Sequence, residues 1–240
     1  MRVLVLGVGE ALDEDYATSS YLVMSQKANV LFDCGDSAVR QFWKLGKPAD
    51  FLDAVYISHG HFDHVNGFLP LLVKMWHDGR KKPITLICQE TWRGPILSSF
   101  LGGTNSPINL VTVSCGKVIE FNGIKLSFAH TNHPVPNLAI RLDDGQAVVC
   151  YSGDGKCQPQ AEQLYQKADL LIHEGYTYED SKEGHESIGG AISVAQRARV
   201  KQLALVHLEQ NFRRHQLPKI RHRIESDTVS IPEPLKMYEL

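Results

Sequence analysis

Four side chains that can bind metal ions stand within six consecutive positions of this sequence. The stretch YISHGHFDHVNG, residues 56–67, contains His59, His61, Asp63 and His64. Zinc and similar divalent ions prefer imidazole and carboxylate ligands, and metal binding compensates for the hydration that these side chains lose. His59 and His61 occupy alternate positions of an expected extended loop, so they can bind one ion from the same side. Asp63 and His64, at the start of the next helix, can reach a second ion beside it.

More candidate ligands occur where predicted strands end. The chain has 11 histidines, and predicted strand ends carry His130, His133, His173 and His207, together with Asp154 in the stretch YSGD. Strand ends of a layered fold converge on one edge, where loops are free to carry function. A lone histidine is most often a surface residue or a hydrogen-bonded core residue. So many suitable ligands at such positions favour a dinuclear metal centre over that ordinary explanation.

The rest of the pattern predicts short strands that alternate with helices. Strands are predicted at 2–8, 20–25, 29–35, 53–58, 83–88, 117–121, 124–131, 138–142, 147–154, 169–174 and 202–208, helices at 37–45, 65–79 and 188–199, a helical or irregular segment at 89–103, and a final strand within 229–240. No linker or shift of composition divides the chain, so we expect one domain over residues 1–240. Two β-rich halves, each followed by helices, predict an α/β (α+β) fold of the αββα sandwich type.

The composition is that of an ordinary soluble globular protein, with 43% hydrophobic and 22% charged residues. The net charge of −2 gives no general attraction to nucleic acid or to a membrane surface. We expect no membrane span, because no stretch approaches the ~20 apolar residues that one needs. The five cysteines are scattered and form no CxxC pair, which indicates reduced thiols and a cytoplasmic location.

The stretch SHGHFDH resembles the signature of the metallo-β-lactamase superfamily, and the resemblance extends over nearly the whole chain. The superfamily fold is an αββα sandwich of two mixed β-sheets flanked by helices, with metal ions at one edge. The resemblance implies one zinc ion at His59, His61 and His133, a second at Asp63, His64 and His207, and Asp154 as the bridging ligand. Every ligand position is filled, which implies a catalytic member with two Zn²⁺ per chain, while manganese and iron stay open as the native metal.

Within this superfamily, the finer similarity is to the ribonuclease Z-like branch. The stretches HPVPNLAIRL, HEGY and GHESIGGA, which begin at residues 133, 173 and 184, resemble three segments of that branch. The resemblance implies that Glu174 and His185 form a proton-donor pair, and that Ser187, at a helix start, holds a phosphate oxygen. The alternative for Glu174 is a supporting or surface carboxylate, and for His185 a surface position in a glycine-rich loop.

This ligand set implies hydrolysis by metal-hydroxide attack. Two adjacent metal ions would lower the pKa of a bridging water and would clamp the oxygen of the attacked group, which suits in-line attack on a phosphodiester. Asp63 would orient the hydroxide as well as bind metal. His185, steadied by Glu174, would protonate the leaving oxygen, a step typically worth ~10²–10⁴-fold. The catalytic residues of the expected phosphodiesterase are therefore Asp63, Glu174 and His185.

The chain departs from the members of the branch that cut tRNA precursors, because those carry a long basic arm between the fifth histidine and the bridging aspartate. Here twenty residues separate His133 from Asp154. Armless relatives act on small phosphodiesters such as cyclic nucleotides, so we expect a small or nucleotide phosphodiester as substrate and favour RNA less. The alternatives are a tRNA 3′-processing endonuclease and a lactone, ester or thioester hydrolase on the same metal centre. Full ligand occupancy argues against a non-enzymatic sensor.

Two further segments bear on binding partners. The run RRHQLPKIRHR, residues 213–223, contains no acidic residue and could contact phosphates, but a solvated helix face is the favoured interpretation. The apolar stretch GFLPLLVKMW, residues 67–76, is predicted either to form a homodimer interface, as in relatives, or to face the core.

Overall fold

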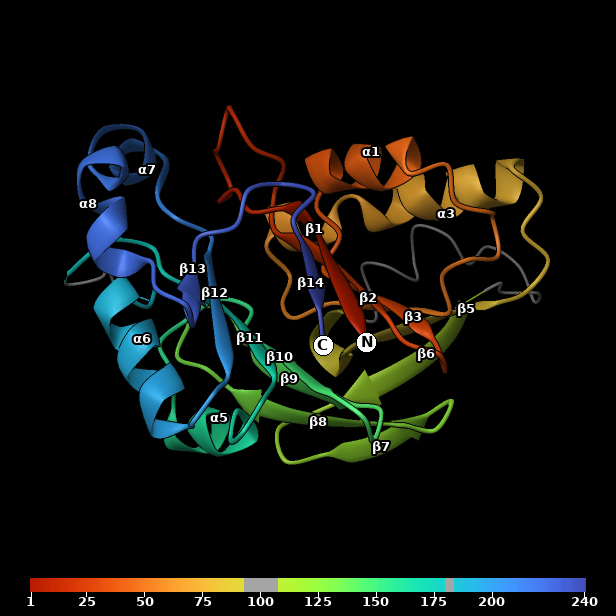
Figure 1. Cartoon of the computed structure of the whole chain (residues 1–240). Helices are drawn as coiled ribbons and strands as arrows, with labels where there is room; N and C mark the ends of the chain where they lie inside the picture. Colours follow the sequence, from red (N-terminus) through yellow and green to blue (C-terminus); the bar gives the residue numbers. More distant parts are fainter. Residues whose placement is uncertain (93–107, 180–183) are drawn as a thin grey trace.

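The computed structural model describes residues 1–92, 108–179 and 184–240, which form two β-sheets of seven strands each (Figure 1). The first sheet has the order β14 (Met237–Glu239), β1 (Arg2–Gly7), β2 (Ser20–Met24), β3 (Asn29–Phe32), β4 (Ala54–Tyr56), β5 (Ile84–Gln89) and β6 (Ile108–Val113). The second has the order β13 (Val229–Ser230), β12 (Gln202–Val206), β11 (Leu170–Glu174), β10 (Val148–Tyr151), β9 (Leu138–Asp143), β8 (Ile124–His130) and β7 (Val118–Phe121). Each sheet contains both antiparallel and parallel neighbours, so both are mixed.

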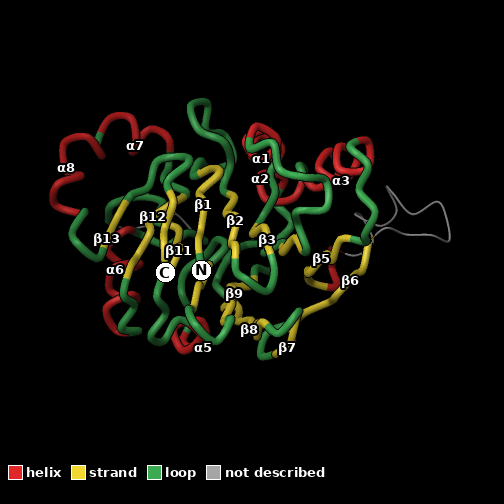
Figure 2. Tube along the Cα trace, turned by 45° about the vertical axis from the view of Figure 1, so that its right-hand side comes forward, coloured by secondary structure: helices red, strands yellow, loops and turns green. Residues whose placement is uncertain are grey.

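Helices cover the outer faces of the two sheets. The first sheet carries α1 (Asp36–Lys44), α2 (Phe62–Val65) and α3 (Phe68–His77), and a 3₁₀ turn η1 (Glu90–Trp92) follows β5. The second carries α5 (Pro159–Leu164), α6 (Ile188–Arg197), α7 (Gln210–His215) and α8 (Leu217–Ile224). Figures 1 and 2 show these two groups of helices on opposite sides of the molecule. The predicted αββα sandwich is therefore confirmed. No described helix has the length and apolar character that a membrane crossing needs.

Strand residues alternate between two apolar cores, because successive side chains of a strand point to opposite faces. In β2, Tyr21 and Val23 face the core between the sheets, whereas Leu22 and Met24 join the core under α1 and α3. Every residue of β2 is buried, which explains why this strand reads as an apolar run rather than an alternating pattern. Burial of each large apolar side chain stabilises the fold by about 1.5–3 kcal/mol. Such strands hold the loops at their ends in place.

The predicted helix at 65–79 is wrong at its beginning, because the structure has a break there between α2 and α3. Gly67 stands at this break, and its amide donates to the Cys34 carbonyl at 2.8 Å. A Cβ on Gly67 would lie 2.1 Å from the Gly35 carbonyl oxygen, so only glycine permits this approach. At this break, α2, which carries the candidate ligands Asp63 and His64, packs against the loop after β3.

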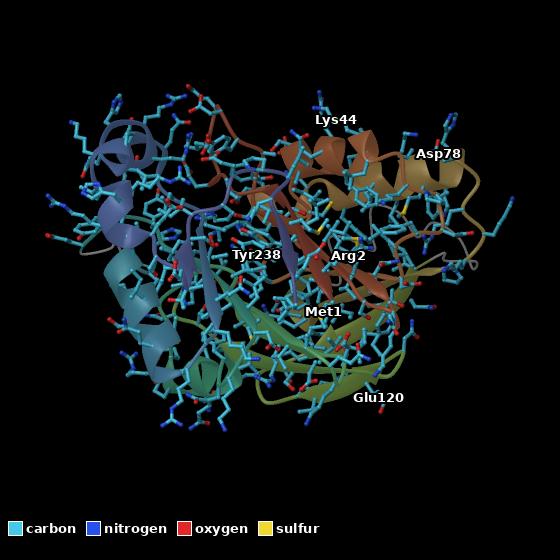
Figure 3. All side chains as sticks on the ribbon, viewed as in Figure 1. Met1, Arg2, Lys44, Asp78, Glu120 and Tyr238 are labelled. Carbon is cyan, nitrogen blue, oxygen red and sulfur yellow. The ribbon has the colours of Figure 1, made fainter. Side chains whose placement is uncertain are left out.

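The two ends of the chain lie side by side in the first sheet (Figure 3). Val3 of β1 pairs with Tyr238 of β14, and the amino group of Met1 donates to the Leu240 carbonyl at 3.0 Å. The predicted C-terminal strand is thus confirmed. Of the segment 89–103, predicted to be helical or irregular, residues 93–103 lie outside the described residues, and 89–92 hold the end of β5 and η1.

Candidate metal centre

The predicted ligands leave their strands at one edge of the sandwich. His59 follows β4, His133 follows β8, Asp154 follows β10 and His207 follows β12. The parallel register of β11 and β12 pairs Glu174 with the residue before His207. Since parallel strands end at a common edge, the loops that follow them meet there. Tertiary structure thus gathers residues that lie as much as 148 positions apart in the chain.

The backbone of His207 has a left-handed conformation, with φ at 55°. A residue with a Cβ adopts this conformation at some cost, which such sites bear when the surrounding structure holds them in place. The His207 amide donates to the carbonyl of Val8, the residue directly after β1 of the other sheet, at 2.9 Å, and this hydrogen bond fixes the turn.

The first group of candidate ligands comprises His59, His61, His133 and Asp154, with one ligand atom from each lying within 4.8 Å of all the others. Nδ1 of His61 is 3.1 Å from Nε2 of His59 and 3.1 Å from Nε2 of His133. Oδ2 of Asp154 lies 3.7 Å from Nε2 of His59 and 3.9 Å from Nε2 of His133. Three imidazoles and a carboxylate oxygen that converge in this way match the donor set of a zinc site.

The second group comprises Asp63, His64 and His207, and it shares Asp154 with the first. Oδ2 of Asp63 lies 3.1 Å from Nε2 of His64 and 3.5 Å from Nε2 of His207. Asp154 presents Oδ1 to His64 at 3.5 Å and Oδ2 to His207 at 3.4 Å. Its carboxylate therefore stands between the two groups, which is the position that a bridging ligand needs.

Several ligand atoms of the second group are buried without a hydrogen-bond partner among the described residues. They are Asp63 Oδ2, His64 Nε2, Asp154 Oδ1, and both ring nitrogens of His207. An unsatisfied buried polar group costs about 1–3 kcal/mol, so native proteins rarely retain several in one place. A cation bound between the two carboxylates, His64 and Nε2 of His207 would satisfy four of these five atoms, whereas Nδ1 of His207 faces Glu174, 3.8 Å from its Oε2. The residues present therefore fit a metal centre.

The protein charges alone already concentrate negative potential at this edge. Burial lowers the pKa of His59 well below its ordinary range. Burial would also lower the pKa of His64, but the Asp154 and Asp33 carboxylates outweigh it and raise that pKa well above the usual value. At His207, Asp154 likewise overcomes burial and raises the pKa to about 9. Carboxylates that hold protons on neighbouring imidazoles attract a metal cation by the same force.

Asp33 is a functional candidate that the sequence reasoning missed. Its buried carboxylate lies 2.6 Å from Nδ1 of His64 and accepts from the Ser58 hydroxyl at 2.7 Å and the Tyr151 hydroxyl at 2.8 Å. A partner on the far nitrogen of a ligand histidine fixes its tautomer and its orientation. The signal was an aspartate that ends the apolar strand in NVLFDCG, where water-exposed positions would be expected to begin.

The predicted pair of Glu174 and His185 is in direct contact. Glu174 is buried, and its Oε2 lies 2.8 Å from Nδ1 of His185. Its Oε1 accepts from the backbone amides of Gly155 and Glu186, so the carboxylate is held from both sides. Ligand atoms of the pair lie within 4.8 Å of those of Asp154 and His207, which places the pair beside the second group.

Ser187 is the N-cap of α6, where its Oγ accepts from the Gly190 amide at 3.0 Å.

Two other strand-end histidines do not join the described ligand groups. Nδ1 of His130 lies 3.2 Å from the Asn137 carbonyl oxygen, and His173 is buried with its ring against Tyr165.

Three of the four arginines in the run 213–223 form ion pairs with carboxylates of the described residues. Arg213 binds Asp13 and Asp15, and Arg214 binds Asp15 and a neighbouring glutamate, across about two hundred positions of the chain. Arg221 binds two further carboxylates. Arg213 and Arg214 thereby anchor the loop between β1 and β2 to α7.

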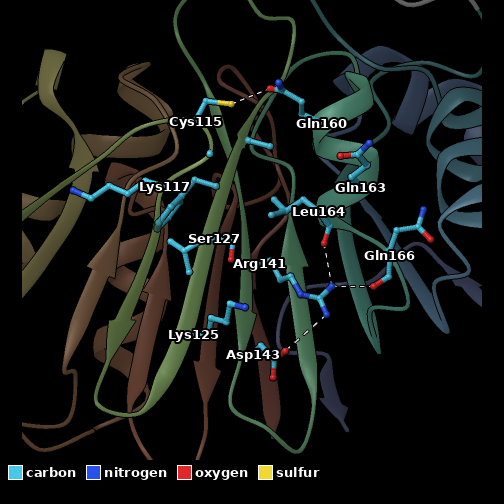
Figure 4. Close-up of a pocket in the computed structure, with 14 residues that line it drawn as sticks. Cys115, Lys117, Lys125, Ser127, Arg141, Asp143, Gln160, Gln163, Leu164 and Gln166 are labelled. Carbon is cyan, nitrogen blue, oxygen red and sulfur yellow. Dashed lines mark hydrogen bonds and ion pairs between the residues drawn. The ribbon is translucent and has the colours of Figure 1, made fainter.

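A groove of about 660 Å³ lies elsewhere, on the outer face of the second sheet (Figure 4). Lys117, Lys125 and Arg141 stand on its strand side, and Gln160 and Gln163 of α5 stand opposite. Arg141 donates to the Leu164 and Gln166 carbonyls at the end of α5, so it serves the packing of that helix. The groove contains none of the predicted ligands or catalytic residues.

Comparison with known proteins identifies related families. The family model that describes the anti-Pycsar protein Apyc1 matches residues 1–225. The ribonuclease Z of Methanosarcina mazei is 24% identical, over 88% of this chain and 88% of its own. The probable metallo-hydrolase YhfI of Bacillus subtilis is 30% identical, over 87% of each chain. The resemblance to ribonuclease Z-like proteins is thereby confirmed.

Solved structures give the same result. The crystal structure of YhfI, a metallo-β-lactamase fold protein from Bacillus subtilis, has a TM-score of 0.84 and 26% identity, covering 99% of this chain and 98% of its own. A diphosphatase of the PhnP family has a TM-score of 0.81 and 17% identity, covering 100% of this chain and 97% of its own. The second likeness shows the shared fold alone.

Proposed function

We propose that this chain, which belongs to the anti-Pycsar protein Apyc1 family, is a dinuclear phosphodiesterase that acts on small or nucleotide phosphodiesters. It is a metal-dependent hydrolase, as its metallo-hydrolase and ribonuclease Z relatives indicate, and we take residues 1–240 as one domain. The observation that carries the proposal is the contact of Glu174 with His185 beside the candidate metal centre. An imidazole held there suits a reaction whose leaving oxygen needs a proton.

Two Zn²⁺ per chain are the cofactors in this proposal. One ion would be held by His59, His61 and His133, the other by Asp63, His64 and His207, with Asp154 between them. When bound, such ions supply an activated water and positive charge that stabilises the phosphate oxygens. The converging donor atoms and the unsatisfied buried nitrogens and oxygens support this assignment.

The side chains have separate roles in the proposed reaction. Asp63 accepts a hydrogen bond from the attacking water and orients it toward phosphorus. Glu174 holds Nδ1 of His185, so that Nε2 can donate a proton to the leaving oxygen. The His185 side chain is 20% exposed, which leaves it accessible to a substrate. Ser187 uses Oγ as an acceptor for its helix, and its hydroxyl hydrogen can still be donated to a phosphate oxygen.

Small substrates suit this chain better than RNA. RNA binding draws most of its affinity from lysine and arginine contacts to phosphates. Three of the four arginines in the run 213–223 are instead paired with carboxylates, among them Arg213 and Arg214. We therefore expect poor cleavage of precursor tRNA, without a sharp preference for one site.

A homodimer through α3 is part of the proposal. The helix buries Phe68, Leu71 and Leu72 against the first sheet, so the predicted core-facing stripe is present. Its other face leaves Val73 53% exposed, in an apolar groove that Leu69 also lines. A second copy could cover this groove, and light scattering of the purified protein would give the mass of the assembly.

The free cysteines support our assignment to the cytoplasm.

The test is a panel of substrates with metal analysis. Protein purified without chelator should contain about two equivalents of divalent metal. It should hydrolyse cyclic AMP and bis-p-nitrophenyl phosphate, should cut precursor tRNA poorly, and should act weakly on p-nitrophenyl acetate. Preferred hydrolysis of the carboxyl ester, or efficient single-site cleavage of precursor tRNA, would contradict the proposed substrate class.

A further inference from the structure

The ring of Tyr176 stacks on that of His185, the proposed proton donor. Tyr176 follows β11 by two residues, and its half-buried ring lies against that of His185. The ring centroids are 4.3 Å apart and the planes differ by 18°, which is a stacked arrangement. The stretch HEGY thus brings a second side chain to the site besides Glu174.

The hydrogen bond to Glu174 constrains the His185 imidazole only in part. It holds Nδ1 at 2.8 Å from the carboxylate, but the ring can still rotate about that direction and swing Nε2 away. A flat ring stacked on one face of the imidazole opposes this rotation. The rings of His207 and His133 are more distant, with centroids 5.8 Å and 5.2 Å from that of His185. Tyr176 makes the closest of these ring contacts to His185.

Backbone hydrogen bonds tie Tyr176 to both segments that must be aligned. Its amide donates to the Glu186 carbonyl at 2.8 Å, directly after His185. Its carbonyl accepts from the Glu209 amide at 2.8 Å, two residues after His207. The ring therefore stands on a backbone fixed from both sides, and this is the kind of support that keeps a functional group in one orientation.

The hydroxyl group of Tyr176 stays protonated at ordinary pH. Burial, followed by the carboxylates of Glu10 and Glu209, raises its pKa to about 12. An ionised phenolate is therefore not available as a base. The ring face is the part of this side chain that acts on His185.

We propose that Tyr176 is a positioning residue that holds the His185 imidazole in the orientation needed to protonate the leaving oxygen. This inference rests on the proposed function, in which His185 is the proton donor. Displacement of a reacting group by ~1 Å can cost ~10²-fold in rate. Loss of the stacked ring should therefore slow the reactions that need the proton and spare those that do not.

The test compares two substrates in the same protein. Cyclic AMP releases an alkoxide that needs a proton, whereas bis-p-nitrophenyl phosphate releases a stable phenolate. Tyr176→Leu should lower kcat for cyclic AMP about tenfold to a hundredfold and leave kcat for the nitrophenyl ester near that of wild type. The ratio of the two rates does not depend on how much of the sample is folded. Metal content should stay at about two equivalents.

Two variants serve as matched controls. Tyr176→Phe keeps the ring and should retain both activities, so a loss as large as that of Tyr176→Leu would overturn the stacking role. Tyr178→Leu changes a nearby tyrosine that is 39% exposed, and it should change neither activity. Selective loss on cyclic AMP in Tyr178→Leu would show that the effect is not specific to the stacked ring and would also overturn the inference.

His185→Ala separates this inference from the proposed function. Equal losses on both substrates in His185→Ala would refute the acid role itself. A selective loss in His185→Ala without one in Tyr176→Leu would refute the positioning role alone. If both are selective, adding Tyr176→Leu to His185→Ala should cause no further loss, because the two residues then share one function. A further selective loss in the double variant would overturn the inference.

Discussion

Asp33→Asn should weaken metal binding although Asp33 itself belongs to neither ligand group. The buried carboxylate receives four donors: the Ser58 amide at 2.8 Å, the Ser58 hydroxyl at 2.7 Å, the Tyr151 hydroxyl at 2.8 Å, and Nδ1 of His64 at 2.6 Å. Asparagine has nearly the same size, but one of its terminal groups is a donor. Whichever way the amide turns, its NH₂ group faces a donor that it cannot satisfy.

The magnitude follows from these contacts. A buried donor left without its acceptor costs about 1–3 kcal/mol. Loss of the group that orients a ligand histidine typically weakens metal binding by about 10–100-fold, which corresponds to about 1.4–2.8 kcal/mol. For Asp33→Asn we therefore expect a Kd about 10–100-fold higher at the site of His64, and a free energy of unfolding lower by about 1–3 kcal/mol.

Two measurements check this expectation. Competition with a chromophoric chelator gives the Kd of each zinc equivalent, and urea unfolding of the chelated protein gives the free energy of unfolding. Asp36→Asn, at an exposed aspartate on the first turn of α1, is the matched control and should change neither value. Wild-type zinc affinity in a folded Asp33→Asn protein would refute the claim that Asp33 orients His64.

Three further predictions concern the ligands themselves. Asp154→Ala should lower the metal content from about two equivalents to one or less, and two retained equivalents by elemental analysis would defeat the bridging assignment. Asp63→Ala should abolish phosphodiester hydrolysis even where metal is partly retained, whereas near wild-type turnover at normal metal content would show that Asp63 has neither role. In the chelated protein, the raised pKa of His207 contributes stability that is present below about pH 6.5 and is lost as pH rises through about 9. Urea unfolding should therefore show falling stability between these values, and a pH-independent free energy would contradict the charge interaction with Asp154.

The elements and the local part of the site could be predicted from the sequence, because both depend on near neighbours. Apolar runs such as SYLVM predict strands, and the spacing in SHGHFDH places four metal-binding side chains within six consecutive residues. The distant candidates, such as His133 and Asp154, were visible as residues at strand ends. Their assignment to particular ions came from the resemblance to a family, since spacing carries no information across separate strands.

Tertiary structure decided what depends on contacts between distant segments. The break at Gly67 results from its approach to Gly35, which no helical periodicity records. The sequence predicts Arg213 on a solvated helix face, whereas in the structure it binds Asp13, which lies two hundred positions away.

The contacts that orient the site histidines also depend on tertiary structure. Asp33 meets His64 because β3 and β4 are parallel neighbours and α2 packs on the loop that follows β3. Tyr176 meets His185 through a hydrogen bond between their two loops. Residue type and spacing determined which side chains could bind metal or move a proton. Packing determined that Asp33 meets His64 and that Tyr176 meets His185, because an orienting contact depends on distance in space and residue types alone do not show which side chains will meet.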